Sequence, residues 1–485
     1  MRKNTAGILA AAFGSWLVVD LCQGGIAWTP AFFTALCLFF REKYSKDPRA
    51  DLLLFWGALA AYLSTFHWRG GDDIPTSLVP IALLRHGTFA IDSVIHPLLT
   101  GKTANFTVAF KGHVLSRYPV AASVLALPVY AIPILTHAPL SELFIHNLSK
   151  ISASLITAAS VWVFYRAARL RAPEKPASAL ALIYAFGTFS FSVSSQALWQ
   201  HGAAQLGLAV GFLGFFGEGF LSEMLCGFGL GLAIAARPDT VFAALGIAFF
   251  LLLNAPKKIP AVALGGAVPS LLVLCYWLYY TGRPLPPEMG LQKSLFVPFQ
   301  PRVFLALFLS PTQGLLWFSP AALFGFWAGL RKESRSAGPW ILAGCLATWI
   351  FFSCYANWVG GMTFGPRYLS AVCVPLLLLC ADSWRALSES SAARTLFSAA
   401  GAFSILVHSL GAYLRWPNSF SVDVEKKVVW RCMDHPLIRF LASDGPLEKI
   451  PLLIRLILMA LLIAGAVFIQ KFIAHSLEEP AAKIK

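Results

Sequence analysis

The sequence has little charge for its length. Of its 485 residues only 13% are charged, whereas 57% are hydrophobic, and the mean hydropathy is +0.68. Soluble globular proteins carry about 25% charged residues. The composition therefore excludes a soluble globular chain and predicts a membrane protein that crosses the bilayer many times. Because the bilayer core cannot hydrate backbone groups, these spans should be helical.

The common catalytic and cofactor motifs are also absent. There is no GxSxG nucleophile motif, no GxxxxGK[ST] phosphate loop, no HExxH zinc pair and no GxGxxG after a strand. The nine cysteines form no CxxC or other metal-ligand spacing and mostly lie inside apolar runs, which indicates packing residues. Any catalysis must therefore depend on a site without one of these motifs.

The net charge of +15 comes from basic residues scattered between the apolar runs. Nucleic-acid binding needs a dense basic patch, and the sequence has none. Membrane lipids with anionic headgroups or lipid phosphates are therefore the expected partners. The first apolar run, 7–21, lacks a convincing small-residue cleavage site, so we expect it to stay as a membrane helix.

The apolar runs predict an all-α, polytopic fold of about 14 transmembrane helices with both termini inside. Runs at about 6–22 and 26–40 form a hairpin that returns to a basic loop, which the positive-inside rule makes cytoplasmic. The run at about 51–67 then crosses outward, and a long external loop follows over 68–144. Its last part, 119–135, is expected to be a juxtamembrane helix. If it crossed the membrane, the basic residues at the end of the next span, 145–168, would lie outside, against the positive-inside rule. Further spans are expected at about 145–168, 176–194, 201–217, 220–236, 239–254, 260–279, 314–330, 338–355, 367–383, 396–414 and 451–470.

We expect one membrane domain over residues 1–485, without internal repeats or low-complexity tracts. It begins with the helical hairpin and cytoplasmic loop of residues 1–50. The core, 51–383, carries the long first external loop and its juxtamembrane helices. The C-terminal helices of residues 384–485 carry a second external loop at 415–450.

Under this topology the unusual polar residues fall on the external face. Asp72 and Asp73 open the first external loop, just past the end of a span. The same loop or later external loops hold Arg117, Trp199, His201, Arg237, Arg367 and Tyr368. A guanidinium at the membrane boundary, flanked by glycine or proline, suits a phosphate group. This one-sided clustering indicates a single site that faces the external leaflet.

Each of these residues also has a purely structural interpretation. The acidic pair could be a solvated helix end, and the arginines could snorkel to lipid headgroups. Trp199 and Tyr368 could be interfacial anchors, and His201 could be a hydrogen-bonded structural group. The residues alone leave these alternatives open.

The arrangement of the motifs resembles the GT-C-type membrane glycosyltransferases, which include protein O-mannosyltransferases and lipid A aminoarabinose transferases. In that family an acidic pair opens the first external loop, an amphipathic helix follows, and a glycine precedes the next polar turn. Here Gly87 lies 15 residues after Asp72, and Tyr118-Pro119 leads an apolar helix. The segments 358–361 and 364–368 look like those of bacterial and archaeal members.

The resemblance implies an inverting transfer of a sugar from a polyprenyl-phosphate donor to an acceptor, on the external side of a bacterial or archaeal plasma membrane. Asp72 would take the proton of the acceptor hydroxyl, and Asp73 would position the acceptor or share that role. Arg367, Arg237 and Arg117, in that order, would neutralise the leaving lipid phosphate. The other expected substrate contacts are His201, Trp199 and Tyr368. The acidic pair could hold a divalent cation, but such sites usually need more oxygen ligands, so no obligatory metal or other cofactor is expected.

The sequence departs from the family pattern at Asp73, where glutamate is common, and in its two N-terminal helices and the 415–450 loop. The acceptor, whether protein, lipid or glycan, therefore stays open. The alternative function is a transporter or flippase of a polyprenyl-linked substrate. A transporter should show inverted repeats and ionisable or helix-breaking residues near the midplane of its spans, whereas the charges here gather at one face.

Overall fold

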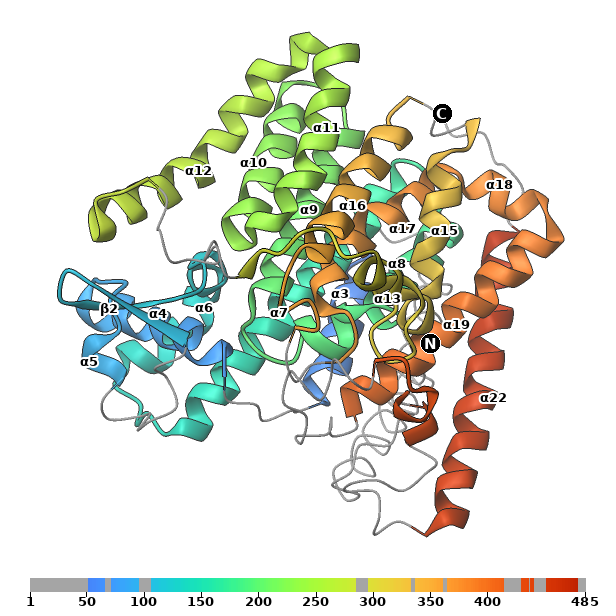
Figure 1. Cartoon of the computed structure of the whole chain (residues 1–485), viewed down its shortest axis with the longest axis horizontal. Coiled ribbons are helices and arrows are strands. Elements are labelled where there is room, and N and C mark those ends of the chain that lie inside the picture. The colour runs from blue at the N-terminus through green and yellow to red at the C-terminus, as the bar shows by residue number, and fades with distance from the viewer. Residues whose placement is uncertain are drawn as a thin grey trace, which may run out of the picture.

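The computed structural model describes residues 51–65, 71–95, 106–284, 295–332, 336–360, 364–413, 429–435, 437–439 and 451–478. Three predicted features lie outside the described residues: the hairpin at 6–40, the residues 66–70 just before the acidic pair, and most of the 415–450 loop. The described part is mostly helical (Figure 1). It packs around two hydrophobic clusters, and Leu206 contacts both.

The elements follow the apolar runs of the sequence. The longer helices are α3 (Leu52–Leu63), α4 (Asp73–His86), α6 (Ala121–Leu135), α7 (Glu142–Arg169), α8 (Glu174–Phe186), α9 (Gln200–Phe216), α10 (Phe220–Ala236), α11 (Val241–Asn254), α12 (Ile259–Thr281), α13 (Pro301–Leu309), α15 (Pro320–Gly329), α16 (Gly338–Ser353), α17 (Cys373–Asp382), α19 (Ser391–Tyr413) and α22 (Leu452–Leu477). Shorter elements that matter for the site are α5 (Asp92–Ile95), α14 (Leu315–Phe318), the π-helical turn η2 (Ser190–Ser194) and the 3-10 helices η3 (Pro238–Thr240) and η7 (Arg367–Val372).

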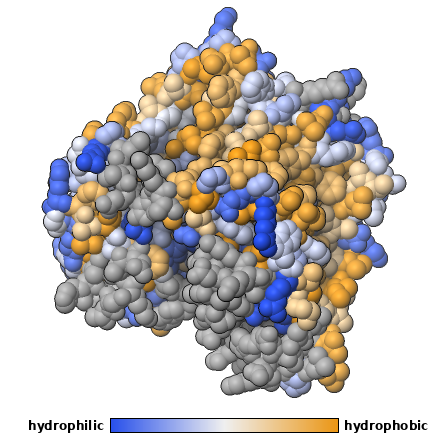
Figure 2. Space-filling view, viewed as in Figure 1, coloured by the Kyte–Doolittle hydropathy of each residue, from blue (hydrophilic) through white to orange (hydrophobic). Residues whose placement is uncertain are grey.

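Several helices are long and apolar enough to cross a membrane. Within the described ranges four meet this criterion, at Glu142–Arg169, Pro256–Thr281, Ser391–Tyr413 and Met459–Leu477, and five more apolar helices are shorter. Hydrophobic side chains also cover broad areas of the surface (Figure 2). On α11 and α12 the exposed ones include Phe249, Leu252, Leu271 and Leu272. The chain is therefore an integral membrane protein, while the count of about 14 spans stays a prediction.

Two predicted spans are interrupted. The run at 176–194 is helical only to Phe186, after which the chain enters the turn η2. The run at 314–330 breaks between α14 and α15, because Pro320 has no N–H and its ring would clash with the preceding turn of a continuous helix. Apolar length alone did not reveal either break.

The all-α prediction missed a β-hairpin in the predicted first external loop. Strands β1 (Thr107–Phe110) and β2 (His113–Ser116) pair antiparallel, with Thr107 opposite Ser116. Both residues of the two-residue turn have positive φ, 47° at Lys111 and 83° at Gly112, as hairpin turns that match the strand twist require. A lysine seldom adopts this conformation, so the turn signal at Lys111-Gly112 is weak.

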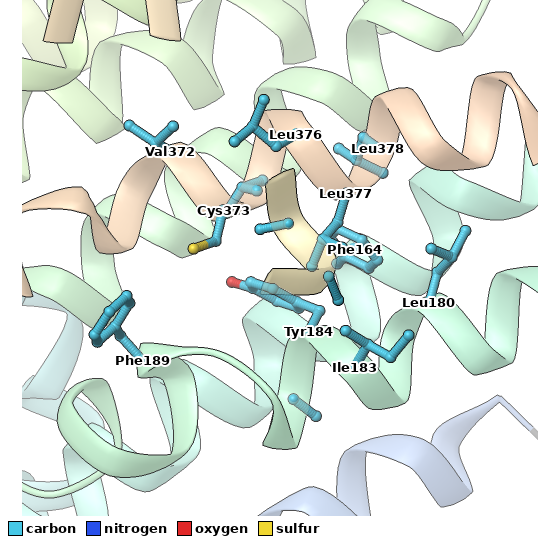
Figure 3. Packing of buried hydrophobic residues seen from close by; sticks show 14 of the residues in the cluster. Phe164, Leu180, Ile183, Tyr184, Phe189, Val372, Cys373, Leu376, Leu377 and Leu378 are labelled. Atoms are coloured by element: carbon cyan, nitrogen blue, oxygen red, sulfur yellow. The ribbon is translucent and has the colours of Figure 1, made fainter. Parts of the chain in front are cut away.

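A tightly packed core joins α7, α8 and α17 (Figure 3). The ring of Tyr184 on α8 stacks on Phe164 of α7, with ring centroids 4.4 Å apart. The Tyr184 hydroxyl shares a hydrogen bond with Ser160 of α7 at 2.5 Å. Leu376 and Leu377 of α17 are fully buried in the same cluster. Since η7 leads directly into α17, this core fixes Arg367, the first residue of η7, relative to α7.

Candidate functional site

The carboxylate of Asp72 is held by two residues that are distant in the sequence. The indole Nε1–H of Trp199 donates to Oδ1 at 2.7 Å, and Nη1 of Arg367 lies 3.0 Å from Oδ2. Asp72 precedes the first residue of α4 but makes no capping hydrogen bond to that helix. Its side chain is 22% exposed. The carboxylate is therefore oriented by Trp199 and Arg367 and remains accessible.

Arg367 is mostly buried, yet it keeps one free donor. Its side chain is 11% exposed, and its Nε has no hydrogen-bond partner among the described residues. The guanidinium carbon also lies 5.8 Å from the ring centroid of Trp199 and 5.7 Å from that of Tyr368. Burial alone would lower the pKa of Arg367, but the negative charge of Asp72 and the neighbouring tyrosines outweigh it, so the pKa is raised. Arg367 thus stays charged, and its buried Nε–H has no partner among the described residues.

Asp73 differs sharply from its neighbour. It is 1% exposed, and its Oδ1 has no partner among the described residues. Its Oδ2 lies 3.9 Å from Nδ1 of His146. Burial, and then the charge of Asp72, raise the pKa of Asp73 well above its ordinary value. The structure therefore favours a neutral carboxylic acid at Asp73 beside the ion-paired Asp72.

This shift makes stability depend on pH. A group with a raised pKa in the folded state stabilises the fold below its unfolded pKa, and this contribution is lost as pH rises through the folded pKa. Since asparagine cannot ionise, Asp73→Asn should escape that loss. The Tm of the variant relative to wild type, measured in detergent, should be higher at about pH 8 than at about pH 5. An offset that does not change with pH would show that Asp73 titrates normally.

Two tyrosines and a second arginine lie around the ion pair. Burial, and then the charge of Asp72, raise the pKa of Tyr118, while the charges of Arg367 and Arg117 oppose the rise. Burial raises the pKa of Tyr355 to about 12, with the same two arginines opposing. Both hydroxyls therefore stay protonated at neutral pH and can donate hydrogen bonds. Two guanidinium groups and two hydroxyl donors make surroundings that suit an anion.

Arg237 and His201 lie behind Arg367 in a buried network. Nε and Nη2 of Arg237 each donate to Asp239 at 3.0 Å, and Nη2 also reaches the Tyr368 carbonyl at 3.3 Å. Its Nη1 contacts Nδ1 of His201 at 2.5 Å and Ser370 Oγ at 3.1 Å. Because arginine can only donate, Nδ1 of His201 accepts, which places the proton of a neutral imidazole on Nε2. These contacts fix η7. They favour a positioning role for Arg237 and His201 over direct contact with a phosphate.

Gly360 provides the space beside the free N–H of Arg367. Its φ is +81°, and a Cβ there would lie 3.3 Å from Arg367 Nε and 3.4 Å from Cε2 of Tyr368. Gly360→Ala should therefore combine a left-handed backbone penalty of about 1–2 kcal/mol with displacement of Arg367. If Arg367 binds substrate, activity should fall about tenfold or more.

Gly112 offers a matched control for Gly360. Its φ is +83°, but a Cβ there would meet no atom within 4 Å. Gly112→Ala should cost similar stability, measured as a change in Tm, and leave activity nearly unchanged. Equal activity losses in the two variants would mean that the space beside Arg367 has no functional role.

All the site residues predicted from the sequence are described, but they do not form one surface. Asp72, Trp199, Arg367 and Tyr368 meet, and the charge of Arg117 acts on the neighbouring tyrosines. Asp73 is buried next to Asp72, and Arg237 and His201 belong to the separate buried network that contacts η7. Sequence reasoning did not assign roles to Tyr118, Tyr355 or Gly360. Tyr118 follows Arg117 directly, and Tyr355 is the last residue of the predicted span at 338–355. These positions could have drawn attention to both tyrosines.

The acidic pair has few further oxygen ligands nearby. Across the ranges that the structure describes, no three His, Cys, Asp or Glu side chains lie together in a way that could hold a metal ion. Both oxygens of Asp72 contact nitrogen donors, and Asp73 is buried.

Comparison with known proteins gives likenesses in fold only. No family model and no curated protein matches the sequence. The chain is similar to ArnT from Cupriavidus metallidurans, solved bound to undecaprenyl phosphate, with 14% identity, coverage of 89% of this chain and 74% of that one, and a TM-score of 0.49. It is also similar to the archaeal oligosaccharyltransferase AglB from Archaeoglobus fulgidus, solved with an inhibitory peptide and a dolichol-phosphate.

For AglB the identity is 11%, the coverage is 90% of this chain and 56% of that one, and the TM-score is 0.45. This chain therefore spans little more than half the length of the archaeal enzyme. Identities and TM-scores this low assign no role to any residue.

Proposed function

We propose that this protein is a membrane glycosyltransferase that moves a sugar from a polyprenyl-phosphate donor to an acceptor hydroxyl. The observation that carries the proposal is the contact between a partly exposed carboxylate, Asp72, and a charged guanidinium, Arg367, whose buried Nε–H has no partner among the described residues. Transfer from a lipid phosphate needs a base for the acceptor and a cation for the leaving group. The resemblance of the Asp72–Gly87 segment to GT-C enzymes supports the same function.

The proposed reaction is a single displacement. The acceptor oxygen forms a bond to the anomeric carbon while its proton passes to Asp72. The bond between that carbon and the phosphate oxygen breaks, and its electron pair remains on the phosphate. One displacement inverts the anomeric configuration. Since the phosphate leaves as an anion, the step requires no general acid, and Arg367 stabilises the charge that develops.

The ion pair links donor binding to the base. The donor phosphate would compete with Asp72 for Arg367 and displace the carboxylate from Nη1. Once Arg367 turns to the phosphate, Oδ2 of Asp72 is free to accept the hydroxyl proton. Trp199 continues to hold Oδ1 and keeps the carboxylate in place. The donor should therefore bind before the acceptor.

The remaining residues take supporting roles in this proposal. Arg117 adds positive charge near the proposed phosphate position at Arg367, and the ring of Tyr368 lies beside Arg367. Arg237 and His201 hold η7 in position. Asp73, as a neutral acid, would donate or accept a hydrogen bond without adding a second negative charge. The site would face the external side of the plasma membrane of a bacterium or archaeon.

Release of polyprenyl phosphate tests the proposal. Purified protein in liposomes is given a panel of polyprenyl-phosphate sugars with a cell-envelope extract as the source of acceptor. Wild type should consume one donor and release polyprenyl phosphate, and Asp72→Asn should not. If no donor is consumed but labelled lipid crosses the bilayer equally in both proteins, the protein is a transporter.

A further inference from the structure

Lys150 is a buried lysine within α7, a helix long and apolar enough to cross a membrane. It is 4% exposed. Its Nζ donates to the Ser195 carbonyl at 2.8 Å, to Gln196 Oε1 at 3.0 Å and to Thr65 Oγ1 at 3.2 Å. All three acceptors are neutral. Ionisable residues are costly to bury and in membrane helices usually mark function, so Lys150 needs an explanation.

The acceptors of Lys150 belong mainly to one turn, residues 195–199, which joins η2 to α9. The other end of this 195–199 turn is held at Leu198. The Leu198 N–H donates to Ser149 Oγ at 2.9 Å, and its carbonyl accepts from Thr76 Oγ1 at 2.7 Å. Ser149 and Lys150 are consecutive on α7, and Thr76 is on α4. The turn is therefore fixed at both ends between these two helices.

The last residue of the 195–199 turn is Trp199, whose indole N–H donates to Asp72. We infer that Lys150 is a positioning residue for Asp72, because it fixes the turn that aims Trp199 at the carboxylate. The inference rests on the proposed function, since the placement of Asp72 matters only if Asp72 acts in the reaction. Without Lys150, the Ser195 carbonyl and Gln196 would lose a shared donor and the turn would shift. A displacement of about 1 Å in such a support can cost about 10²-fold in rate.

A double-mutant cycle tests the inference. Lys150→Met and Trp199→Phe should each lower kcat by roughly 10- to 100-fold and leave the donor KM nearly unchanged, because Arg367 stays in place. If Lys150 acts through Trp199, the double variant should be no slower than Trp199→Phe alone. A residue with a merely structural role would instead give multiplied losses.

Ser154 provides the matched control. It lies one turn along α7 and donates to the same Ser195 carbonyl, at 3.2 Å, but carries no charge. Ser154→Ala should therefore keep kcat within about twofold of wild type. If Lys150→Met fails to fold, Lys150→Gln retains a donor on a shorter, neutral side chain and enters the same cycle.

The outcomes separate the two proposals. Multiplied losses in the double variant, or wild-type kcat in the Lys150 variant, would overturn the positioning role while the glycosyltransferase proposal stands. If Trp199→Phe and Asp72→Asn are both fully active, the proposed site itself is wrong, whatever Lys150 does.

Discussion

Asp72→Asn is expected to lower kcat for sugar transfer by about 10²- to 10⁴-fold, the usual contribution of a general base. The amide has nearly the same shape as the carboxylate but cannot take up the acceptor proton. The variant should still fold, because Asp72 is partly exposed and makes no capping bond to α4, but its Tm should fall, because the mostly buried Arg367 loses its counter-charge. Single-turnover release of polyprenyl phosphate in liposomes is the measurement. A fully active variant would remove Asp72 as the base.

The same variant also tests competition for Arg367. With Asp72 neutral, the guanidinium no longer has to leave an anionic partner, so polyprenyl phosphate without a sugar should bind about two- to fivefold more tightly. Asp92→Asn is the control, because Asp92 lies on α5 of the same predicted loop and its side chain is 40% exposed. It should leave the affinity unchanged. Weaker binding by Asp72→Asn would contradict a competition between carboxylate and phosphate.

Arg367→Ala is expected to lower kcat/KM for the donor by about 10²- to 10³-fold, the usual cost of losing one group that stabilises developing negative charge. Both the stabilisation of the leaving phosphate and the donor-binding N–H are lost. Arg367→Lys should recover only part of the activity, since an ammonium keeps the charge but lacks the planar guanidinium fork. The measurement is the rate of release at varied donor concentration.

Arg85 supplies the control for Arg367. It lies in the last turn of α4, in the same predicted external loop, and its side chain is exposed. Arg85→Ala should leave the donor dependence within about twofold of wild type. An unchanged donor dependence in Arg367→Ala would instead make Arg367 an anchor to lipid headgroups.

The helical part of the fold was largely predictable because apolar length is a local signal. Predicted spans at 201–217 and 220–236 correspond to α9 and α10 within a residue at each end. The misses arose where conformation depends on single residues or on tertiary contacts. Lys111 takes a positive φ because the hairpin twist requires it. The end of α8 at Phe186 is marked by Gly187, a helix-stop signal that the apolar run had concealed.

The candidate site was predictable as a set of residues but not as a geometry. Asp72 drew attention as part of an acidic pair just past the end of a predicted span, and Arg367 through its proline neighbour, yet nothing in the sequence paired them. The sequence could have shown that Arg237 has a partner in Asp239, two residues on. Burial of Asp73 was not predictable, because adjacent residues at the start of a helix differ in exposure only through what packs against them.

The pairing of Asp72 with Arg367 also bears on how the protein is made. Chains are synthesised from the N-terminus, and early segments begin to fold first. Asp72 and the 195–199 turn therefore reach the membrane long before η7 exists. Until Arg367 has been added, Asp72 has no counter-cation and His201 lacks its contact with Ser370. If the proposed function is right, the nascent protein would be unable to catalyse transfer until most of its length has been inserted, and lipid-linked sugars would be protected from a half-built enzyme.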